Sequence, residues 1–314
     1  MSLNKDLIYK FADITSKAAI ATYKYIGKKD KIIADKAAVD TMRNELNKLD
    51  MDGKIVIGEG ELDKAPMLYI GEKLGTGRDL QLDIAVDPLE GTNFVANNLP
   101  GGLSVIAVAE KDNLFNAPET YMEKLASGSD VPSGLLDLDF PIEKNIKNLA
   151  DFKKKDLSDL TVCILERPRH KKLIDKLNNL KVNLKLITDG DVTGALLVTN
   201  KKYKVDLFLG IGGGPEGVLA ASALDAYGCN FQGRFIFKTK ENKKRAKDMG
   251  VIDLDKKYEL KEIIKGDSIF CATGITDGDL VKGIYVSDNF YTSETFVTHK
   301  NSQTKEIIKK ENSK

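Results

Sequence analysis

The spacing of apolar positions predicts two amphipathic helices within the first fifty residues of the chain. In the first helix, apolar side chains recur every three or four residues, which places them on one face. A charged break at residues 28–31 ends this pattern, and a second helix is expected over roughly residues 35–49. The apolar positions of the first helix are Leu7, Phe11, Ile14, Ala18 and Ala21.

Short apolar runs follow the two helices and predict buried strands at residues 54–57, 80–86 and 103–109. Beyond a polar stretch at residues 142–160 the pattern changes, because strand-like and helix-like segments alternate. Such alternation is typical of βαβ units and predicts a largely parallel sheet. The expected order is strand 161–165, helix 170–180, strand 182–187, helix 192–199, strand 205–209 and a helix starting near Pro215.

The polar stretch is the expected boundary between two halves, residues 1–150 with α+β character and residues 151–314 with α/β character. The fold class is therefore α/β overall. The Lys-rich tail, residues 301–314, is expected to be frayed. A basic stretch at residues 238–247 contains no aromatic side chains, which favours a solvated helix face over a nucleic-acid site.

Composition and charge narrow the class of protein. A chain with 42% hydrophobic and 30% charged residues is typical of a soluble globular protein. Its net charge of +1 gives no overall attraction to nucleic acid or to an acidic membrane. No apolar run is long enough to cross a bilayer, and the N-terminus does not resemble a secretory signal. Cys163, Cys229 and Cys271 are scattered, which suits core positions in a cytoplasmic protein.

Several enzyme classes are disfavoured. With only His170 and His299, one chain cannot supply a three-histidine metal site, and the GxSxG, GxxxxGK[ST] and HExxH patterns are absent from the sequence. GGGPEG at residues 212–217 formally satisfies the dinucleotide-binding pattern GxGxxG. A dinucleotide-binding oxidoreductase is nevertheless disfavoured, because the motif lies late in the chain and no acidic residue ends the next expected strand, residues 234–237.

An acidic cluster at the end of an expected buried strand points to a cation. In DIAVDPLEGTNF, residues 83–94, Asp87 and Glu90 follow an apolar run directly. Buried carboxylates need a counter-charge, and Mg²⁺ or Mn²⁺ prefers oxygen ligands of this kind. Pro88 is expected to end the strand ladder, and Gly91 allows the backbone to approach a ligand closely. Thr92 then falls near a helix start, where backbone N–H groups can face an anion.

Further carboxylates lie upstream. In IVIGEGELDKAP, a short apolar strand leads to Glu59 and Glu61, which are flanked by Gly58 and Gly60. Asp35 is expected to open the second helix. Each acid alone could be a turn former or a helix cap. Two acidic clusters at strand ends in one chain favour a carboxylate-rich metal site.

The sequence resembles class II fructose-1,6-bisphosphatases of the GlpX type, within the lithium-sensitive sugar phosphatase superfamily. DPLEGT matches the superfamily element D-P-[ILV]-[DE]-G-[ST], and the resemblance runs in order from about residue 5 to about residue 298. It implies a layered α/β/α/β/α sandwich and metal-dependent hydrolysis of fructose 1,6-bisphosphate to fructose 6-phosphate and phosphate, a gluconeogenic step. The segments that carry it are IVIGEGELDKAPMLYIGEKLGTG, DIAVDPLEGTN, APETYMEK, RPRH, TDGD, GIGGGPEGV and ATGITDGDL.

The resemblance also implies roles for individual residues. Thr92 would orient or help to deprotonate the attacking water, and Glu59 would combine metal binding with basicity. The first half would then be the metal-binding half and the second the substrate-binding half. The implied ligands of Mn²⁺ or Mg²⁺ are Asp35, Glu59, Asp87, Glu90 and Glu216. The implied substrate contacts are Glu90, Gly91, Thr92, Tyr121, Arg167, Pro168, Arg169, Asp189, Gly190, Asp191 and Gly213.

For several of these residues the sequence leaves a second interpretation open. The arginines of RPRH could bind a phosphate through paired donors or form a surface charge cluster. Tyr121 could be a core aromatic. Asp189 and Asp191 suit sugar hydroxyl groups, but Asp191 could equally be a helix N-cap. Glu216 reads either as a first-turn acid that complements the helix dipole or as a metal ligand brought against the first-half carboxylates.

Alternatives to the implied function concern the substrate and catalysis itself. Sedoheptulose 1,7-bisphosphate could be a second substrate, and an inositol phosphate fits the second-half motifs less well. A non-catalytic sugar-phosphate sensor would be expected to lack some of the metal carboxylates, and none is missing from the sequence. The expected partner is a small sugar bisphosphate, without nucleic acid or membrane, and the chain is expected to form a homo-oligomer, either a dimer or a tetramer.

Overall fold

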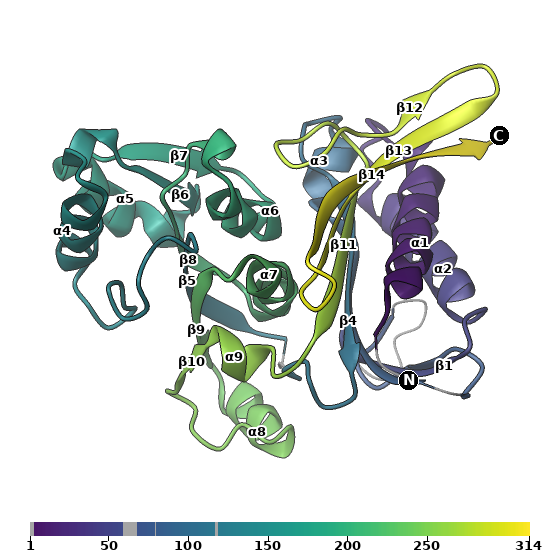
Figure 1. Ribbon diagram of the computed structural model, residues 1–314, viewed down its shortest axis with the longest axis horizontal. Coiled ribbons are helices and arrows are strands. Elements are labelled where there is room, and N and C mark those ends of the chain that lie inside the picture. Colours follow the sequence, from purple (N-terminus) through teal and green to yellow (C-terminus); the bar gives the residue numbers. More distant parts are fainter. Residues whose placement is uncertain (1–2, 59–67, 79, 117–118) are drawn as a thin grey trace. The chain divides into compact units, whose positions relative to one another are not determined.

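The computed structural model describes residues 3–58, 68–78, 80–116 and 119–314, and its chain divides into two compact units (Figure 1). Unit 1 comprises Met1–Asn116 and Ile264–Lys314, and unit 2 comprises Ala117–Ile263. These limits differ from the expected division at residue 150. The reason is that the last strands of the chain return to the sheet begun by the first strands, so that unit 2 is inserted within unit 1.

Unit 1 is built on an eight-stranded sheet of mixed direction, with the order β12-β13-β11-β4-β3-β1-β2 and with β14 paired to β13. β1 runs parallel to β3, whereas β3, β4, β11 and β13 alternate in direction. The strands are β1 (Met51–Ile57), β2 (Lys73–Leu74), β3 (Leu80–Glu90), β4 (Leu103–Glu110), β11 (Ser268–Gly274), β12 (Tyr285–Val286), β13 (Phe290–His299) and β14 (Thr304–Ser313).

Helices α1 (Lys5–Tyr23) and α2 (Lys31–Leu46) confirm the two predicted N-terminal helices and cover one face of this sheet (Figure 1). The Asp30 side chain caps α2 by accepting a hydrogen bond from the Ile33 amide. The prediction that Asp35 opens the second helix is therefore wrong, because the helix begins four residues earlier, at Lys31. The core under both helices includes Phe11, Met42, Ile55, Ile84, Ile106, Cys271 and Val297.

The C-terminal tail is an ordered strand, and the prediction of a frayed tail is wrong. All ten residues of β14 pair with β13, from Phe290 opposite Ser313 to His299 opposite Thr304. Most of its side chains are exposed or half-buried, because β14 is an edge strand. Lysines on an exposed edge discourage pairing with another chain, which explains why this segment looks like a disordered tail in the sequence.

Unit 2 contains a six-stranded sheet with the order β10-β9-β5-β8-β6-β7. Only the block β7-β6-β8 is parallel, while β5 lies antiparallel between β8 and β9. The prediction of a largely parallel sheet thus applies to half of the strands, since it missed β5 before the alternating segment. The strands are β5 (Tyr121–Ser127), β6 (Thr161–Leu165), β7 (Asn183–Ile187), β8 (Leu207–Gly213), β9 (Asn230–Ile236) and β10 (Lys257–Glu259).

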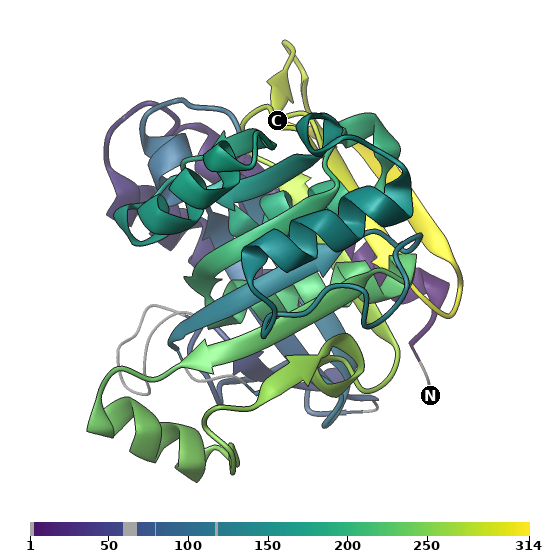
Figure 2. The ribbon, with the colours of Figure 1, turned by 90° about the vertical axis from the view of Figure 1, so that its left-hand side faces the viewer.

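Helices cover both faces of this sheet (Figure 2). One face packs α4 (Ile142–Lys153) and α5 (Lys171–Asn179), and the other packs α6 (Asp191–Leu196) and α7 (Gly214–Tyr227). The polar stretch expected to separate two halves is α4 itself, whose buried face joins the unit 2 core. Its polar appearance comes from the opposite, solvated face. The remaining helices are α3 (Thr92–Ala96) in unit 1 and α8 (Lys240–Asp248) and α9 (Leu260–Ile263) in unit 2.

These features confirm the α/β class, with two mixed sheets and helices packed on them. All three cysteines are free and buried, as core residues should be. The predicted solvated basic helix is also confirmed, because α8 buries only Ala246. Within the described residues, none of the helices combines the length and the apolar character needed to cross a bilayer.

Candidate active site

The carboxylates of Asp87 and Glu90 are brought to one face of β3 by a β-bulge. Asp87 lies opposite Val105 of β4, and Glu90 lies opposite Leu103, so three steps along β3 match two steps along β4. In a regular strand, side chains three residues apart face opposite sides of the sheet. The extra residue cancels that alternation, and both acids therefore face the same side.

Pro88 occupies the bulge, where its missing N–H costs no ladder hydrogen bond. The prediction that Pro88 ends the ladder is wrong by two residues, since pairing resumes at Glu90. The Leu89 amide donates to Asp87 Oδ1 at 3.2 Å, which holds that side chain at the bend. The bulge thus orients the side chains of Asp87 and Glu90 to the same side of the sheet.

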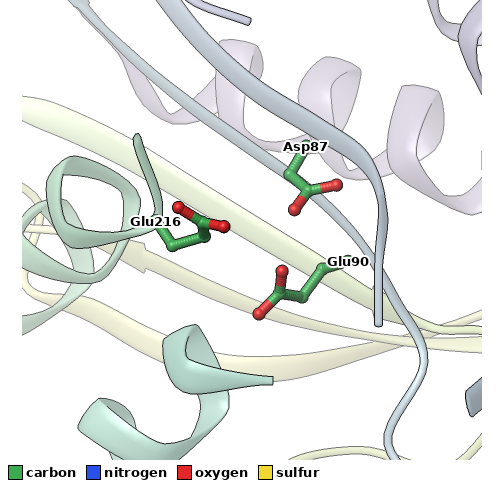
Figure 3. Close-up of side chains that lie close together, drawn as sticks. All are labelled: Asp87, Glu90 and Glu216. Carbon is green, nitrogen blue, oxygen red and sulfur yellow. The ribbon is translucent and has the colours of Figure 1, made fainter. Parts of the chain in front are cut away.

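The two carboxylates leave the same stretch of β3 (Figure 3) and have oxygen atoms within 4.8 Å of each other. Glu90 is only 5% exposed, and Asp87 is half-buried. Two like charges this close in a poorly solvated place repel each other unless a cation lies between them. The donor set consists of carboxylate oxygens, which fits the hard cations Mg²⁺ and Mn²⁺.

Gly91 and Thr92 follow at the start of α3. Gly91 adopts the left-handed conformation with φ 76°, and a Cβ there would lie 2.8 Å from Cδ2 of Phe94. Only glycine accepts this conformation without strain. The chain turns at Gly91, and Thr92 becomes the first residue of α3, half-buried and adjacent in sequence to the acidic pair.

Two other predicted metal ligands are not part of this close pair. Asp35 is half-buried within α2 and is absent from the close acidic group found among the described residues. Glu59 lies outside the described residues, as do Gly60 and Glu61. Their assignment as ligands stays a prediction.

The predicted substrate contacts of unit 2 all lie at one edge of its sheet. The parallel strands β6, β7 and β8 end there, and each leads directly into a predicted motif. Because β5 is antiparallel to β8, its first residue, Tyr121, pairs with Gly213 at the same edge. The carboxyl ends of parallel strands are a usual place for ligands in α/β sheets. The contacts gathered here are Tyr121, Arg167, Pro168, Arg169, Asp189, Gly190, Asp191 and Gly213.

The arginines at this edge are held by specific partners. Arg167 pairs with Asp189 at 3.5 Å, and Arg169 Nε donates to the Ile211 carbonyl at 2.9 Å. The Arg169 guanidinium lies 5.0 Å from the centre of the Tyr121 ring. Tyr121 is 40% exposed, which rules out the alternative of a core aromatic. Lys238 was not predicted as a site residue, but its ammonium group also lies near the Tyr121 ring, 4.9 Å from the ring centre.

His170 is a structural residue of this edge that the sequence did not distinguish. Its Nε2 accepts from the Ile211 amide at 2.7 Å, so Nδ1 carries the proton and donates to the Leu165 carbonyl at 2.6 Å. β6 and β8 pair at only two positions, and the neutral ring replaces the missing ladder bonds beyond them. Burial, assisted by the positive Arg169 and Arg167, lowers the pKa of His170.

Asp191 does not cap a helix, so that alternative is also removed. Gly190 is the N-cap of α6, with φ 75° and no side-chain cap. Asp191 instead accepts a hydrogen bond at 2.5 Å from Lys124, a lysine of the central strand β5 that is only 1% exposed. Lys124 belongs to the APETYMEK segment. No strand was predicted there, so the burial of this lysine was not foreseen.

Glu216 (Figure 3) lies in the first turn of α7, and its carboxylate lies close to Gly213. A Cβ on Gly213 would come within 1.8 Å of Glu216 Oε2, so only glycine fits at this position. Burial, followed by repulsion from the Asp191 carboxylate, raises the pKa of Glu216 to about 6. An exposed acid that merely complements a helix dipole would not carry these constraints.

Comparisons with known proteins agree with one another. The family model described as bacterial fructose-1,6-bisphosphatase, glpX-encoded, matches residues 5–312. A Haemophilus influenzae protein named fructose-1,6-bisphosphatase class 2 is 43% identical, covering 96% of this chain and 94% of the relative. An Escherichia coli K12 protein named fructose-1,6-bisphosphatase 1 class 2 shows the same identity and coverage. A Synechococcus protein named D-fructose 1,6-bisphosphatase class 2/sedoheptulose 1,7-bisphosphatase is 39% identical, covering 98% and 95%.

Proposed function

Because this chain belongs to the bacterial, glpX-encoded fructose-1,6-bisphosphatase family, we propose that its carboxylate pair at the end of β3 binds the divalent cations used to hydrolyse a sugar bisphosphate. The reaction converts D-fructose 1,6-bisphosphate to D-fructose 6-phosphate and phosphate. It is a gluconeogenic step catalysed by a phosphoric monoester hydrolase. The observation that carries the proposal is the bulge that turns Asp87 and Glu90 to one face of the sheet.

The cation is Mn²⁺ or Mg²⁺, held by Asp87 and Glu90 together with Asp35, Glu59 and Glu216. Bound divalent cations neutralise a phosphate dianion and stabilise the departing oxygen. Asp87 and Glu90 supply two adjacent oxygen donors that are already aimed in one direction. Glu216 supplies a carboxylate whose pKa is raised by burial and by the neighbouring Asp191 carboxylate. The resemblance of GIGGGPEGV to the family supports its place in the shell.

Thr92 and Glu59 act on the attacking water. The Thr92 hydroxyl accepts or donates a hydrogen bond that orients the water toward phosphorus, and the Glu59 carboxylate takes up its proton. The water oxygen bonds to phosphorus as the bond between phosphorus and the C1 oxygen breaks. The proton finally resides on the released C1 hydroxyl group. Positioning and charge stabilisation suffice for this chemistry.

The sheet edge of unit 2 binds the rest of the substrate. Arg167 and Arg169 bind the phosphate that is not cleaved, and Tyr121 packs beside it. The turn formed by Asp189, Gly190 and Asp191 meets the sugar hydroxyl groups. The backbone of Gly213 approaches the sugar. Glu90, Gly91 and Thr92 contact the reacting phosphate, and Pro168 fixes the direction of the arginine-bearing turn.

A phosphate-release assay tests the proposal. The purified protein is given fructose 1,6-bisphosphate, sedoheptulose 1,7-bisphosphate and inositol 1-phosphate, each with Mg²⁺ and with Mn²⁺. We expect release from fructose 1,6-bisphosphate, and release from both bisphosphates would establish dual specificity like that in the name of the Synechococcus relative. Binding of fructose 1,6-bisphosphate without any release would contradict catalysis and support a sensor.

We further propose that the protein works in the cytoplasm as a dimer or tetramer. Light scattering after gel filtration measures the assembly directly. A mass equal to the 34.6 kDa chain at assay concentrations would contradict the oligomer.

A further inference from the structure

A buried ion pair in unit 2 lies directly behind the turn that Asp189, Gly190 and Asp191 form. Lys124 is 1% exposed and Asp191 is 6% exposed, and their charged atoms are 2.5 Å apart. Lysine is almost never fully buried, because removing its charge from water is costly unless a partner compensates. A pair that only stabilised the fold could be replaced by apolar residues of similar volume at little cost.

The sheet is shaped around this lysine by glycines. Lys124 sits in β5 between Gly210 of β8 and Gly233 of β9, so no side chain stands beside it in either neighbouring strand. On α7, a Cβ at Gly217 would meet Lys124 Cε at 3.5 Å. These glycines therefore leave room for the long side chain, which reaches Asp191 at the start of α6.

Gly212 has the most specific place in this arrangement. A Cβ there would lie 1.8 Å from Asp191 Oδ2 and 3.1 Å from Lys124 Nζ. Any larger residue would displace the carboxylate from the ammonium group. The glycine run that begins in β8, which formally satisfies the dinucleotide-binding pattern GxGxxG, thus has a different role at Gly212, where glycine leaves room for the ion pair.

The turn that carries Asp191 is fixed at both of its acids. Asp189 forms an ion pair with Arg167 at 3.5 Å, whereas Asp191 is bound to Lys124 of the central strand β5. Lys124 engages only one of the two Asp191 oxygens, Oδ2. A carboxylate held in one position is a better acceptor for a sugar hydroxyl group than a mobile one.

We propose that Lys124 is a positioning residue that holds the Asp191 carboxylate ready to accept a hydroxyl group of the sugar, with Gly212 keeping space for the pair. This inference rests on the proposed function, in which Asp191 contacts the substrate. It assigns Lys124 a role in substrate recognition that acts through Asp191 alone. Lys124 therefore affects sugar-containing ligands and leaves the binding of phosphate groups unchanged.

The test uses Lys124→Met, Lys124→Gln, Asp191→Asn and the double variant Lys124→Met/Asp191→Asn. Lys176→Met serves as the control, because it removes a lysine from an exposed ion pair with Glu143 in the same unit. For each protein we measure the melting temperature, kcat and KM for fructose 1,6-bisphosphate. We also measure the inhibition constant of hexane-1,6-diol bisphosphate, which carries both phosphates but no sugar hydroxyl groups.

Lys124→Met is expected to raise KM roughly tenfold, the equivalent of about 1.4 kcal/mol. Its inhibition constant for the hydroxyl-free bisphosphate should equal that of the parent, and the control should match the parent throughout. Lys124→Gln retains an N–H donor without the charge and should give an intermediate KM, which keeps the test open if Lys124→Met does not fold. Asp191→Asn and the double variant should share one raised KM, because Lys124 has nothing left to position.

Three results would overturn the proposal. A lower melting temperature with an unchanged KM in both Lys124 variants would make the pair purely structural. Equal weakening of sugar and hydroxyl-free ligands would show that Lys124 acts on phosphate. A higher KM in the double variant than in Asp191→Asn would show that Lys124 acts independently of Asp191. If the parent protein itself is inactive on every substrate, the proposed function is refuted instead.

Discussion

Asp87 and Glu90 point to the same face of β3, although they lie three positions apart along the strand, because one extra residue is inserted opposite β4. This relationship converts a sequence motif into a pair of adjacent oxygen donors. It also explains why a proline is tolerated inside a buried strand, since the bulge needs no N–H at that position. The proposed metal site depends on it.

Removing divalent metal should abolish activity. The predicted ligands are all carboxylates, whose mutual repulsion requires a cation. We expect no phosphate release after chelation with EDTA and gel filtration, and recovery on addition of Mn²⁺ or Mg²⁺ but not of Na⁺. Full activity in the metal-free protein would contradict the mechanism.

Thr92→Ala should lower kcat by roughly 10²-fold or more, the usual range for loss of a group that assists proton transfer. KM should change less, because the hydroxyl acts in the transition state. Thr92→Ser should retain part of the activity, whereas Thr92→Val, which keeps the shape but not the hydroxyl, should resemble Thr92→Ala. A normal kcat for Thr92→Val would limit Thr92 to shaping the start of α3.

Arg169→Ala should mainly raise the KM for fructose 1,6-bisphosphate. Loss of one charge-assisted contact costs about 1.5–3 kcal/mol, and a phosphate that does not react is bound similarly in the ground and transition states. Arg169→Lys should recover little, because lysine lacks the Nε donor that bonds the Ile211 carbonyl. Lys171→Ala is the matched control, because Lys171 is exposed and lies two residues away. Equal effects of the two alanine variants on KM would show that Arg169 acts only through its positive charge and not through a specific contact.

Stability should fall on the acid side because of His170. Burial lowers the pKa of His170 in the folded chain below its unfolded value of about 6.5. As the pH falls through 6.5, the unfolded chain therefore takes up a proton that the folded chain does not, and the native state loses up to about 1.4 kcal/mol per pH unit. Urea unfolding of the parent and of His170→Gln between pH 5 and 7.5 measures this. Identical pH slopes in the two proteins would contradict it.

If Glu216 is a metal ligand as proposed, Glu216→Gln should raise the Mn²⁺ or Mg²⁺ concentration needed for half-maximal activity and should lower kcat. The melting temperature of the metal-free protein should change little. Glu241→Gln is the control, since Glu241 is also a first-turn acid, on the exposed helix α8. If the two variants behave alike, Glu216 is only a partner of the helix dipole. In a metal-bound crystal structure, a Glu216 carboxylate distant from the ion would likewise refute its role as a ligand.

Local patterns in the sequence predicted most elements but not their partners. The apolar period identified α1, α2 and the parallel strands of unit 2, because burial of one face leaves a regular trace. The same period could not show that β14 returns to β13, since an edge strand with lysines looks like a solvated tail. Likewise, α4 looked like a linker because only its buried face is apolar.

The candidate site shows the same division. The motifs at strand ends were visible because acids, arginines and glycines are unusual there. Lys124 was missed, because its own strand does not reveal that its neighbours in the two adjacent strands are glycines. The need for a glycine at position 212 was missed as well, because Asp191, for which it leaves room, belongs to a different element. Contacts between distant segments leave no local pattern.

The insertion of unit 2 between β4 and β11 determines the order in which the two units can fold during translation. β4 emerges early, but its neighbour β11 is translated only after all of Ala117–Ile263. Unit 2 has its own sheet and core, so it can become compact before the last strands of unit 1 have been synthesised. During that interval the exposed edge of β4 is open to wrong pairing. A chain stalled before Ser268 should therefore contain a protease-resistant unit 2 beside a protease-sensitive N-terminal segment.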